Sequence, residues 1–335
     1  LKKLEKWEGH FYNWYNTETL EPLSPLYVST VDNGNLVCYL ITLMQGLNEI
    51  WKRPLIDKEN ISGLYDILAV DLGIENIEHI SILQVLLNSE QVNIMEWQML
   101  LEDLKGQNED LDSFIREYEK EIISFTPWVK QLQKIPTTLL NENRPYTNTS
   151  KKMSELLEKL NGSLSIQYLY DNYLEILKGL SETLASLNRD VGNSPGYIEA
   201  RNWLKQLEIS LGESYSAMKV FYARIRKLQR DIESLVHEMD FSLLYHEKKE
   251  LFAIGYNVED GELSKSYYDL LASEARQASF VAIAKGDIPQ KHWFKLGRSL
   301  SLTGDLRVLI SWTGTMFEYL MPLLIMKSYD NTLLD

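Results

Sequence analysis

The chain has 335 residues, of which 44% are hydrophobic and 24% are charged, as in a globular protein with a sizeable core. Its net charge of −14 argues against a nucleic-acid backbone or an anionic membrane surface as partner, whereas a neutral sugar is compatible with it. The single cysteine, Cys38, excludes an internal disulfide, and no run of about 18 apolar residues predicts a membrane span. The chain starts without Met inside a charged amphipathic segment, so we expect it to be a piece of a longer polypeptide.

The N-terminal part predicts two helices and a connection between them. Residues 1–20 carry aromatic side chains at helical spacing and predict the first helix. Prolines mark the connection over residues 20–35. Asp32 or Asn33 is expected to cap the second helix, from Leu36 to about Trp51.

From about Asp57 to Met239 the pattern is almost entirely helical, because good helix formers dominate. Breaks are expected at Gly73, Gly106, Pro127, Pro136, Pro145, Gly162 and residues 192–196. The clearest periodicity places apolar residues three and four apart, at Met218, Phe221, Ile225, Leu228, Ile232, Leu235 and Met239. It predicts one long helix, which either packs within the chain, the interpretation we favour, or forms a self-associating coiled coil.

The character of the sequence changes at Phe241. Residues 241–257 contain two β-like runs around His-Glu-Lys-Lys and predict a hairpin. After the Asp260-Gly261 turn, Ser264 is expected to cap a helix that continues to about Lys285.

The stretch from Val308 to Met326 holds one carboxylate between apolar residues. Its first half predicts a short buried strand, and its second half predicts a helix with Thr313 or Thr315 as N-cap. Glu318 would lie in the first turn among apolar neighbours, so we expect its pKa to be raised, as a general acid in glycoside chemistry requires. The residue pattern alone favours a simpler role, in which Glu318 complements the helix dipole.

Common catalytic and cofactor motifs are absent from the sequence. It has no G-x-x-x-x-G-K-[ST], G-x-G-x-x-G, H-E-x-x-H or G-x-S-x-G, and its five histidines are scattered, so neither a nucleotide site nor a zinc site is expected. What remains is a set of carboxylates near aromatic or basic residues: Asp32 after Tyr27, Glu274 beside Arg276, and Glu318 after Trp312. Rings and carboxylates together suit sugars, although aromatic residues at helical spacing are more often core, and Asp32 is more often a helix cap.

Three blocks of the sequence carry a family resemblance. Residues 9–36, GHFYNWYNTETLEPLSPLYVSTVDNGNL, resemble a pattern usually written FYNWYDT…YVSTVDSGNL in the glycoamylase-like cyclisation domain of bacterial cyclic β-1,2-glucan synthases. Residues 250–300 and 309–326 resemble the same family, and the three blocks follow in family order over about a third of the chain. Asn16 replaces the usual Asp and Asn33 the usual Ser, so an acid role at position 16 is not expected.

The resemblance implies a fold dominated by α-helices: an incomplete (α/α)6 barrel with a long helical segment and a small β-hairpin. Residues 1–56 would begin the barrel domain, residues 57–240 would form the helical segment, and residues 241–335 would continue the barrel, truncated at the C-terminus. The implied partners are β-1,2-glucan and the glycosyltransferase and phosphorylase-like domains of the same synthase. The implied location is the cytoplasmic face of the bacterial inner membrane, as part of a multi-pass protein, and no cofactor is implied.

The implied reaction is transglycosylation, in which a linear β-1,2-glucan is cut internally and the 2-hydroxyl of its own non-reducing end closes the ring. Retention of configuration requires a covalent glycosyl-enzyme and two carboxylates about 5 Å apart. Glu318 is predicted to be one of them, as nucleophile or acid/base, and the other is expected beyond Asp335. Sugar contacts are predicted at Trp14, Tyr15, Asp32, Asn35, Glu274, Arg276 and Trp312. For Glu274 and Arg276, an ion pair that orients the barrel is an equal alternative.

Two other functions compete with this one. The chain could bind glucan, or present it to other domains, without chemistry. It could also be an all-helical interaction protein, in which case an exposed apolar seam along Met218, Phe221, Ile225 and Leu228 is expected. Hydrolysis would replace cyclisation if water were the acceptor.

Overall fold

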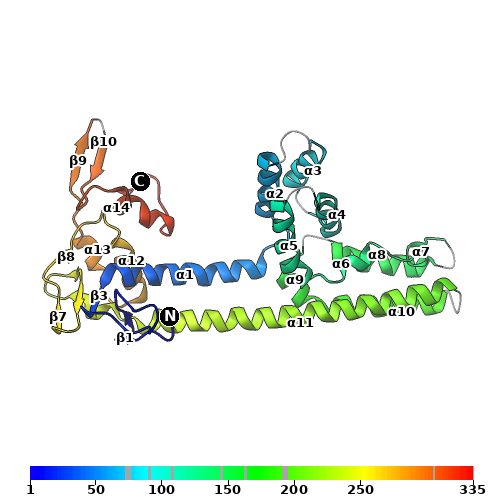
Figure 1. Cartoon of the computed structure of the whole chain (residues 1–335), viewed down its shortest axis with the longest axis horizontal. Coiled ribbons are helices and arrows are strands. Elements are labelled where there is room, and N and C mark those ends of the chain that lie inside the picture. The colour runs from blue at the N-terminus through cyan, green and yellow to red at the C-terminus, as the bar shows by residue number, and fades with distance from the viewer. Residues whose placement is uncertain are drawn as a thin grey trace. The chain divides into compact units, whose positions relative to one another are not determined.

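The computed structural model describes residues 1–71, 77–89, 92–106, 109–143, 146–161, 164–190, 195–304 and 306–334. Helices dominate these residues and the strands are short (Figure 1), which confirms the predicted helix-dominated fold. The chain divides into two compact units. Unit 1 combines residues 1–47 with 227–335, and unit 2 comprises residues 48–226.

Unit 2 is built from helices and their connections. It contains the end of α1 (Thr30–Lys52), α2 (Lys58–Asp71), α3 (Ile77–Asn88), α4 (Ile94–Leu104), α5 (Glu109–Ile123), α6 (Val129–Leu132), α7 (Thr137–Leu140), α8 (Thr147–Asn161), α9 (Ile166–Asp171), α10 (Tyr173–Asp190) and most of α11 (Pro195–Glu238). The predicted breaks at Gly106, Pro127 and Pro136 fall between helices and are confirmed. The predicted breaks at Gly73, Pro145, Gly162 and residues 192–194 lie outside the described residues.

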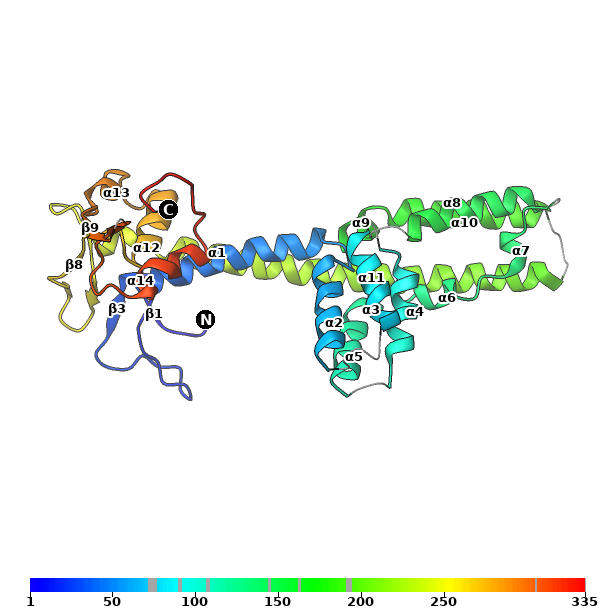
Figure 2. The ribbon, with the colours of Figure 1, turned by 90° about the horizontal axis from the view of Figure 1, so that it is seen from above.

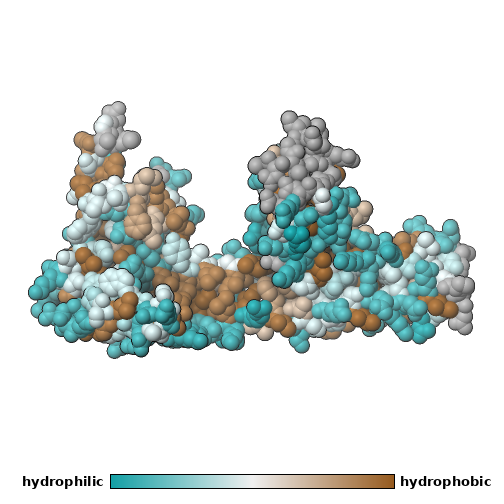
Figure 3. Space-filling view, viewed as in Figure 1, coloured by the Kyte–Doolittle hydropathy of each residue, from teal (hydrophilic) through white to brown (hydrophobic). Residues whose placement is uncertain are grey.

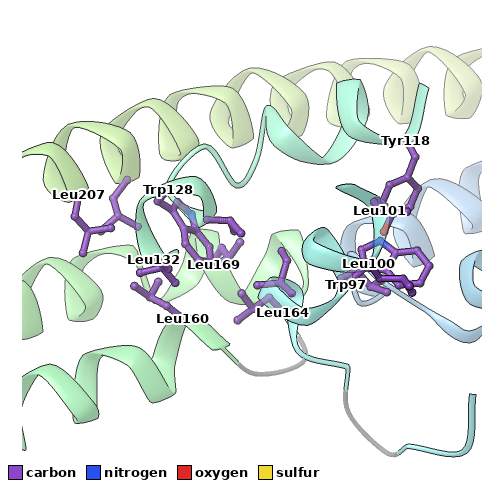
Figure 4. Close-up of a cluster of buried hydrophobic side chains, with 14 of the residues drawn as sticks. Trp97, Leu100, Leu101, Tyr118, Trp128, Leu132, Leu160, Leu164, Leu169 and Leu207 are labelled. Atoms are coloured by element: carbon purple, nitrogen blue, oxygen red, sulfur yellow. The ribbon is translucent and has the colours of Figure 1, made fainter. Parts of the chain in front are cut away.

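Apolar residues three and four positions apart form the faces through which these helices pack. In α8 the apolar residues Met153, Leu156 and Leu160 are buried, and α8 lies along α10, whose Ile176 and Leu180 are buried in turn. The same core includes two fully buried tryptophans (Figure 4). Side chains drawn around them are Leu100, Leu101 and Tyr118 near Trp97, and Leu132, Leu160, Leu169 and Leu207 near Trp128.

The predicted long helix is confirmed, since α11 runs without interruption to Glu238. Met218 and Ile225 are buried within the chain and Phe221 packs partly against the core, while Leu228 is 42% exposed. The continuous exposed seam expected of a self-associating coiled coil is therefore not observed. Packing within the chain accounts for the periodicity.

Unit 1 combines short antiparallel strands with helices. Its strands are β1 (Lys6–Trp7), β2 (His10–Phe11), β3 (Tyr27–Ser29), β4 (Tyr245–His246), β5 (Leu251–Ala253), β6 (Gly255–Asn257), β7 (Glu262–Leu263), β8 (Tyr267–Tyr268), β9 (Leu300–Thr303) and β10 (Leu306–Leu309). They pair as β1-β2, β3-β6-β7, β4-β5-β8 and β9-β10. The predicted hairpin over residues 241–257 is present as β4 and β5, after a 3-10 turn at Phe241–Leu244.

The helices of unit 1 meet through a close approach of α1 and α12 (Arg276–Lys285). Gly34 of α1 lies against Ala278 of α12, and the Cys38 thiol contacts the Gln277 carbonyl at 3.7 Å. The end of α11 completes this core with Ile232 and Leu235 and runs beside α1 (Figure 2). The remaining helices are α13 (Lys291–Lys295), α14 (Met316–Leu320) and the 3-10 helix η3 (Met321–Leu324).

The predicted N-terminal helix over residues 1–20 is wrong, because this segment contains the hairpin β1–β2. Its turn holds Glu8 and Gly9 at positive φ, and a Cβ at Gly9 would overlap the Glu238 carbonyl. The Trp7 ring stacks on Tyr256 with ring centroids 4.2 Å apart. Tertiary packing of the aromatic residues therefore overrides their apparent helical spacing.

Two other helix starts were misplaced by the sequence pattern. Helix α1 begins at Thr30, so Asp32 and Asn33 lie inside its first turn and do not cap it. The helix expected from Ser264 begins only at Arg276, because residues 262–268 pair as β7 and β8. The predicted end near Lys285 is confirmed, and Gly286 caps the helix in the left-handed region.

The C-terminal part of unit 1 exposes many apolar side chains. The strand predicted near Val308 exists as β10, but Leu309 is its buried residue and Val308 is exposed. Figure 3 shows hydrophobic surface over the β9–β10 hairpin and around α14. The exposed residues include Leu300, Leu302, Met316, Phe317, Leu320 and Leu324.

Candidate functional site

Glu318 lies where the sequence predicts, in the first turn of α14, with Thr315 as N-cap. Thr315 and Glu318 form a capping box, in which the Thr315 hydroxyl accepts from the Glu318 backbone and the Glu318 carboxylate accepts from the Thr315 backbone. The Glu318 residue is only 5% exposed. A carboxylate with so little access to water needs donors from the protein.

The donors come from the loop that precedes α14. Oε2 of Glu318 accepts hydroxyl hydrogen bonds from Ser311 (3.2 Å), Thr313 (2.7 Å) and Thr315 (3.0 Å), and backbone N–H bonds from Thr313 (3.2 Å) and Thr315 (3.0 Å). Oε1 accepts from the backbone N–H groups of Trp312 (3.0 Å) and Thr313 (3.2 Å). The loop is thus closed around one carboxylate.

The predicted upward shift of the Glu318 pKa is wrong. Burial does raise the pKa of this carboxyl, but hydrogen bonds from Thr313 and Thr315 outweigh burial and lower the pKa to about 2. Glu318 is therefore ionised at neutral pH. To act as a general acid, this carboxylate would first have to take up a proton.

This pKa predicts a pH-dependent contribution to stability. Because the folded-state pKa lies below the ordinary value of 4.5, the stabilisation is present above pH 4.5 and is lost as the pH falls towards 2. Its upper limit is about 3 kcal/mol, from 1.36 kcal/mol per pKa unit. We expect the difference in unfolding free energy between wild type and Glu318→Gln, measured in guanidinium, to shrink over that range. A difference that does not vary with pH would contradict the assignment.

Arg276 and Asn35 reach the same part of unit 1. Arg276, which is 4% exposed, donates from Nη2 to the carbonyl of Tyr319 at 3.1 Å, directly after Glu318. The Asn35 side-chain nitrogen contacts Met321 Sδ at 4.0 Å, and its buried Oδ1 has no hydrogen-bond partner among the described residues. Burial lowers the pKa of Arg276. Among the described residues Arg276 forms no ion pair with Glu274, so that alternative is not observed.

Asp32 and Glu274 approach a tyrosine that the sequence did not single out. Burial first, and then the charges of Glu274 and Asp32, raise the pKa of Tyr268. Tyr268 pairs with Phe252 of β5, and the hydroxyl of Thr30 at the start of α1 donates to the carbonyl of Ala253, the residue after Phe252. The first turn of α1 therefore meets this sheet, which places Asp32 near Tyr268.

The three aromatic residues predicted as sugar contacts differ in their surroundings. Trp312 is 53% exposed, and its backbone is fixed by Glu318. Trp14 is 49% exposed in a segment that turns back at Asn16, whose side chain accepts from the Glu18 and Thr19 backbone. The Tyr15 hydroxyl donates to the Glu5 carbonyl, so it holds the N-terminal segment. Within the described part of the chain, no hydrogen bond or ring contact connects Trp14 or Tyr15 with α14.

A groove in unit 1 lies away from these residues. It encloses about 850 Å³ between α1, the end of α11 and the end of α12, and it contains none of the predicted site residues. Its polar lining includes the ion pair of Lys285 with Asp287 (2.9 Å). Among the described residues, no three His, Cys, Asp or Glu side chains lie close enough to hold a metal ion.

Sequence reasoning missed the hydroxyl groups around Glu318. The spacing Thr315-x-x-Glu318 is that of a capping box and was sufficient to predict the helix start. Nothing in the local pattern indicated that Ser311 and Thr313 would turn inward as well. Asn33 was also missed: its buried amide joins α1 to the Phe11 backbone through bonds of 2.8 and 3.0 Å.

Comparison with known proteins identifies a relative along the whole chain. All of the chain aligns, over 343 positions and with 31% identity, with the cyclic β-(1,2)-glucan synthase NdvB of Rhizobium meliloti (strain 1021). The chain spans about a tenth of that relative's length. No family model matches the chain. No helix among the described residues combines the length and apolarity needed to cross a membrane. The match confirms the resemblance found in the sequence: over its whole length, the chain is related to a segment of a cyclic β-1,2-glucan synthase.

Proposed function

We propose that the chain is part of a domain that cleaves linear β-1,2-glucan and closes it into a ring by retaining transglycosylation. The observation that supports it best is the alignment of the whole chain with a cyclic β-(1,2)-glucan synthase. The site adds chemical support: the buried Glu318 accepts from the backbone of the exposed Trp312, and Arg276 and Asn35 contact the neighbouring residues Tyr319 and Met321. A retaining mechanism requires one carboxylate of this kind.

The neighbouring groups suit a neutral, hydroxyl-rich ligand. Among the described residues, Arg276 uses one of its five N–H donors, on the Tyr319 carbonyl, and the buried Oδ1 of Asn35 has no donor, so both have capacity for sugar hydroxyls. The Trp312 ring offers a face on which C–H groups can stack. Asp32 and Glu274 would accept hydroxyl hydrogen bonds near Tyr268. We further propose Trp14 and Tyr15 as additional sugar contacts.

We propose that unit 1 is the part of the chain that belongs to an incomplete (α/α)6 barrel. The close packing of α1 on α12 is consistent with barrel helices, and the exposed apolar residues of α14 and β9–β10 suit contacts with further helices. The helical segment of residues 57–240 would be an insertion into this barrel.

The same relationship supports a larger setting for the chain. We propose that it works beside glycosyltransferase and phosphorylase-like domains of one multi-pass synthase, on the cytoplasmic face of the bacterial inner membrane. The second carboxylate of the reaction would come from a residue beyond Asp335.

The mass of the glucan products tests the proposal. A polypeptide that contains residues 1–335 and continues past Asp335 is incubated with linear β-1,2-glucan. A cyclic product has neither a reducing nor a non-reducing end, so its mass is lower by one water than that of the linear glucan of the same length. We expect products of this lower mass to accumulate. Shorter linear products alone would identify a hydrolase. Glucan that binds but is not converted would identify a non-catalytic binding or scaffold domain.

A further inference from the structure

A pocket lies within unit 2, among the helices of residues 48–226. It encloses about 540 Å³, which falls in the range of about 300–1,000 Å³ that is usual for ligand pockets. Its lining comes from segments far apart in the sequence: Ile50 of α1, Asn60 of α2, Tyr118 and Ile122 of α5, Ile166 of α9 and Phe221 of α11. None of the sugar contacts proposed above belongs to this lining, so the pocket has no role in that site.

Aromatic packing and the backbone fix the segments around the pocket. Trp51 contacts Tyr170 of α9 and Tyr222 of α11, with ring centroids 5.4 and 4.8 Å apart. The chain that follows α1 is held to the segment before α9, because the Leu55 N–H donates to the Leu164 carbonyl at 2.7 Å. The walls are therefore formed without a ligand, which lowers the ordering cost of binding.

Two phenylalanines give the pocket an aromatic wall. Phe125 and Phe221 meet edge to face with ring centroids 5.2 Å apart, and both side chains are partly accessible. They also line a second hollow of about 410 Å³, which reaches Val220 and Arg224 of α11, so the two hollows meet at this ring pair. An edge-to-face pair leaves at least one face of each ring uncovered by the other ring. Such faces suit the C–H groups of a sugar.

Another part of the lining is polar and internally ordered. Arg53 pairs through Nη2 with Asp57 at 2.8 Å, and its side chain remains 45% exposed, so the guanidinium is accessible. Oδ1 of Asp57 accepts from the Asn60 N–H at 2.9 Å, and Oδ1 of Asn60 accepts from the Asp57 N–H at 3.3 Å. Arg53 and Asp57 are the charged residues of the described lining, and their charges cancel.

This combination favours a neutral polyol over an apolar or an ionic ligand. A guanidinium donates and a carboxylate accepts, so the pair of Arg53 and Asp57 can serve neighbouring hydroxyl groups. An apolar partner, such as the face of a helix, would take water from this pair without replacing its hydrogen bonds. A strongly charged ligand would meet one like charge in the pocket for every opposite one.

Ring closure sends part of the glucan away from the reacting centre. In the proposed reaction, the internal bond that is cut and the 2-hydroxyl of the same chain's non-reducing end meet at one pair of carboxylates. The glucose units between them must form a loop that leaves the centre. A second contact on the same chain raises the overall affinity through effective concentration, with no change at the reacting bond.

We propose that this pocket of unit 2 is a second binding site for β-1,2-glucan, which retains a part of the chain that is not reacting. The identity of the sugar rests on the proposed function. The rings of Phe125 and Phe221 stack on the C–H faces of glucose units. Arg53, Asp57 and Asn60 hydrogen-bond to their hydroxyl groups.

Isoleucine methyl resonances test binding without any turnover. The chain of residues 1–335, labelled with ¹³C at the isoleucine δ1 methyl groups, is titrated with linear β-1,2-glucan up to about 10 mM, which detects a Kd of about 1 mM. We expect the methyl groups of Ile122 and Ile166 to shift and to saturate with one Kd. The methyl group of Ile198, exposed on α11 outside the pocket, should not shift. Pocket methyl groups that stay unmoved would overturn the proposal.

The same titration on variants tests the two kinds of contact. Arg53→Met keeps most of the side-chain length and should raise the Kd about tenfold by removing charge-assisted hydrogen bonds. Arg116→Met is its control, because Arg116 is exposed on α5 outside the pocket. Phe221→Leu should raise the Kd about three- to tenfold by removing a ring face. Its control, Phe114→Leu, removes a ring packed on the same core but not on the pocket. Equal effects in variants and controls would overturn the site.

Turnover separates this inference from the proposed function. In a polypeptide that continues past Asp335, Arg53→Met should raise KM for ring formation about as much as it raises Kd, because the lost contact is the same in the ground state and the transition state. A lower kcat at unchanged KM would overturn the retention role. Wild type that binds glucan in the pocket but forms no ring would overturn the proposed function alone. Ring formation with unmoved pocket methyl groups would overturn the second site alone.

Discussion

Replacing Glu318 by glutamine should lower the conversion of linear β-1,2-glucan by on the order of 10⁴-fold or more, because an amide can serve neither as the nucleophile nor as the acid/base of the proposed reaction. The measurement is the rate of ring-mass product formation by a polypeptide that contains residues 1–335 and continues past Asp335. Glutamine keeps the length of the side chain, but its NH2 group would face donors from Thr313 and Thr315. Near-ultraviolet circular dichroism should therefore confirm that the variant remains folded.

A matched control is available in the same chain. Glu175 also lies in the first turn of a helix, α10, where it pairs with Lys159 at 2.6 Å on the surface of unit 2. Glu175→Gln should leave turnover unchanged, since surface ion pairs contribute little. If Glu318→Ala regains activity with azide, an α-glycosyl azide would identify Glu318 as the nucleophile and a β-glycosyl azide would identify it as the acid/base. If Glu318→Gln turned over glucan at the wild-type rate, Glu318 would have only a structural role, as part of the capping box of α14.

The site shows which properties of a residue can be predicted from its sequence neighbours. The position of Glu318 in a first turn followed from Thr315 and the apolar run after it, and the structure agrees. Its protonation state did not follow, because counting apolar neighbours captures burial and ignores donors. The donors of Ser311 and Thr313 become apparent only when the loop closes in three dimensions.

The same distinction explains the outcome for the fold. Long amphipathic helices such as α11 are encoded locally, by apolar residues repeated over many turns. The N-terminal hairpin is not, since β1 and β2 are two residues long and depend on packing against Tyr256 and the Glu238 backbone. Strands this short carry too few residues for an alternating pattern to be visible.

The contact of α1 with α12 is the other feature that local patterns do not reveal, and it should be highly sensitive to substitution. In Gly34→Ala the new Cβ would overlap the Cβ and Cα of Ala278. The two helices must then separate, and we expect a loss of unfolding free energy of about 3 kcal/mol or more. Since Asp32 and Asn35 flank Gly34 in α1 and Arg276 lies near Ala278 in α12, glucan binding should weaken as well.

Two variants test whether the close approach causes this effect. Gly46→Ala lies in the same helix and meets no atom within 4 Å, so it should be neutral or stabilise the protein by up to about 1 kcal/mol, as alanine favours helix over glycine. The double variant Gly34→Ala/Ala278→Gly removes the opposing methyl group and should recover most of the lost unfolding free energy. The recovery should fall short by about 1 kcal/mol, because glycine is less favourable than alanine within α12. Additive effects of the two substitutions would mean that the helices do not meet at this point. A favourable coupling, together with restored glucan binding, would show that this contact aligns α1 and α12 for the sugar.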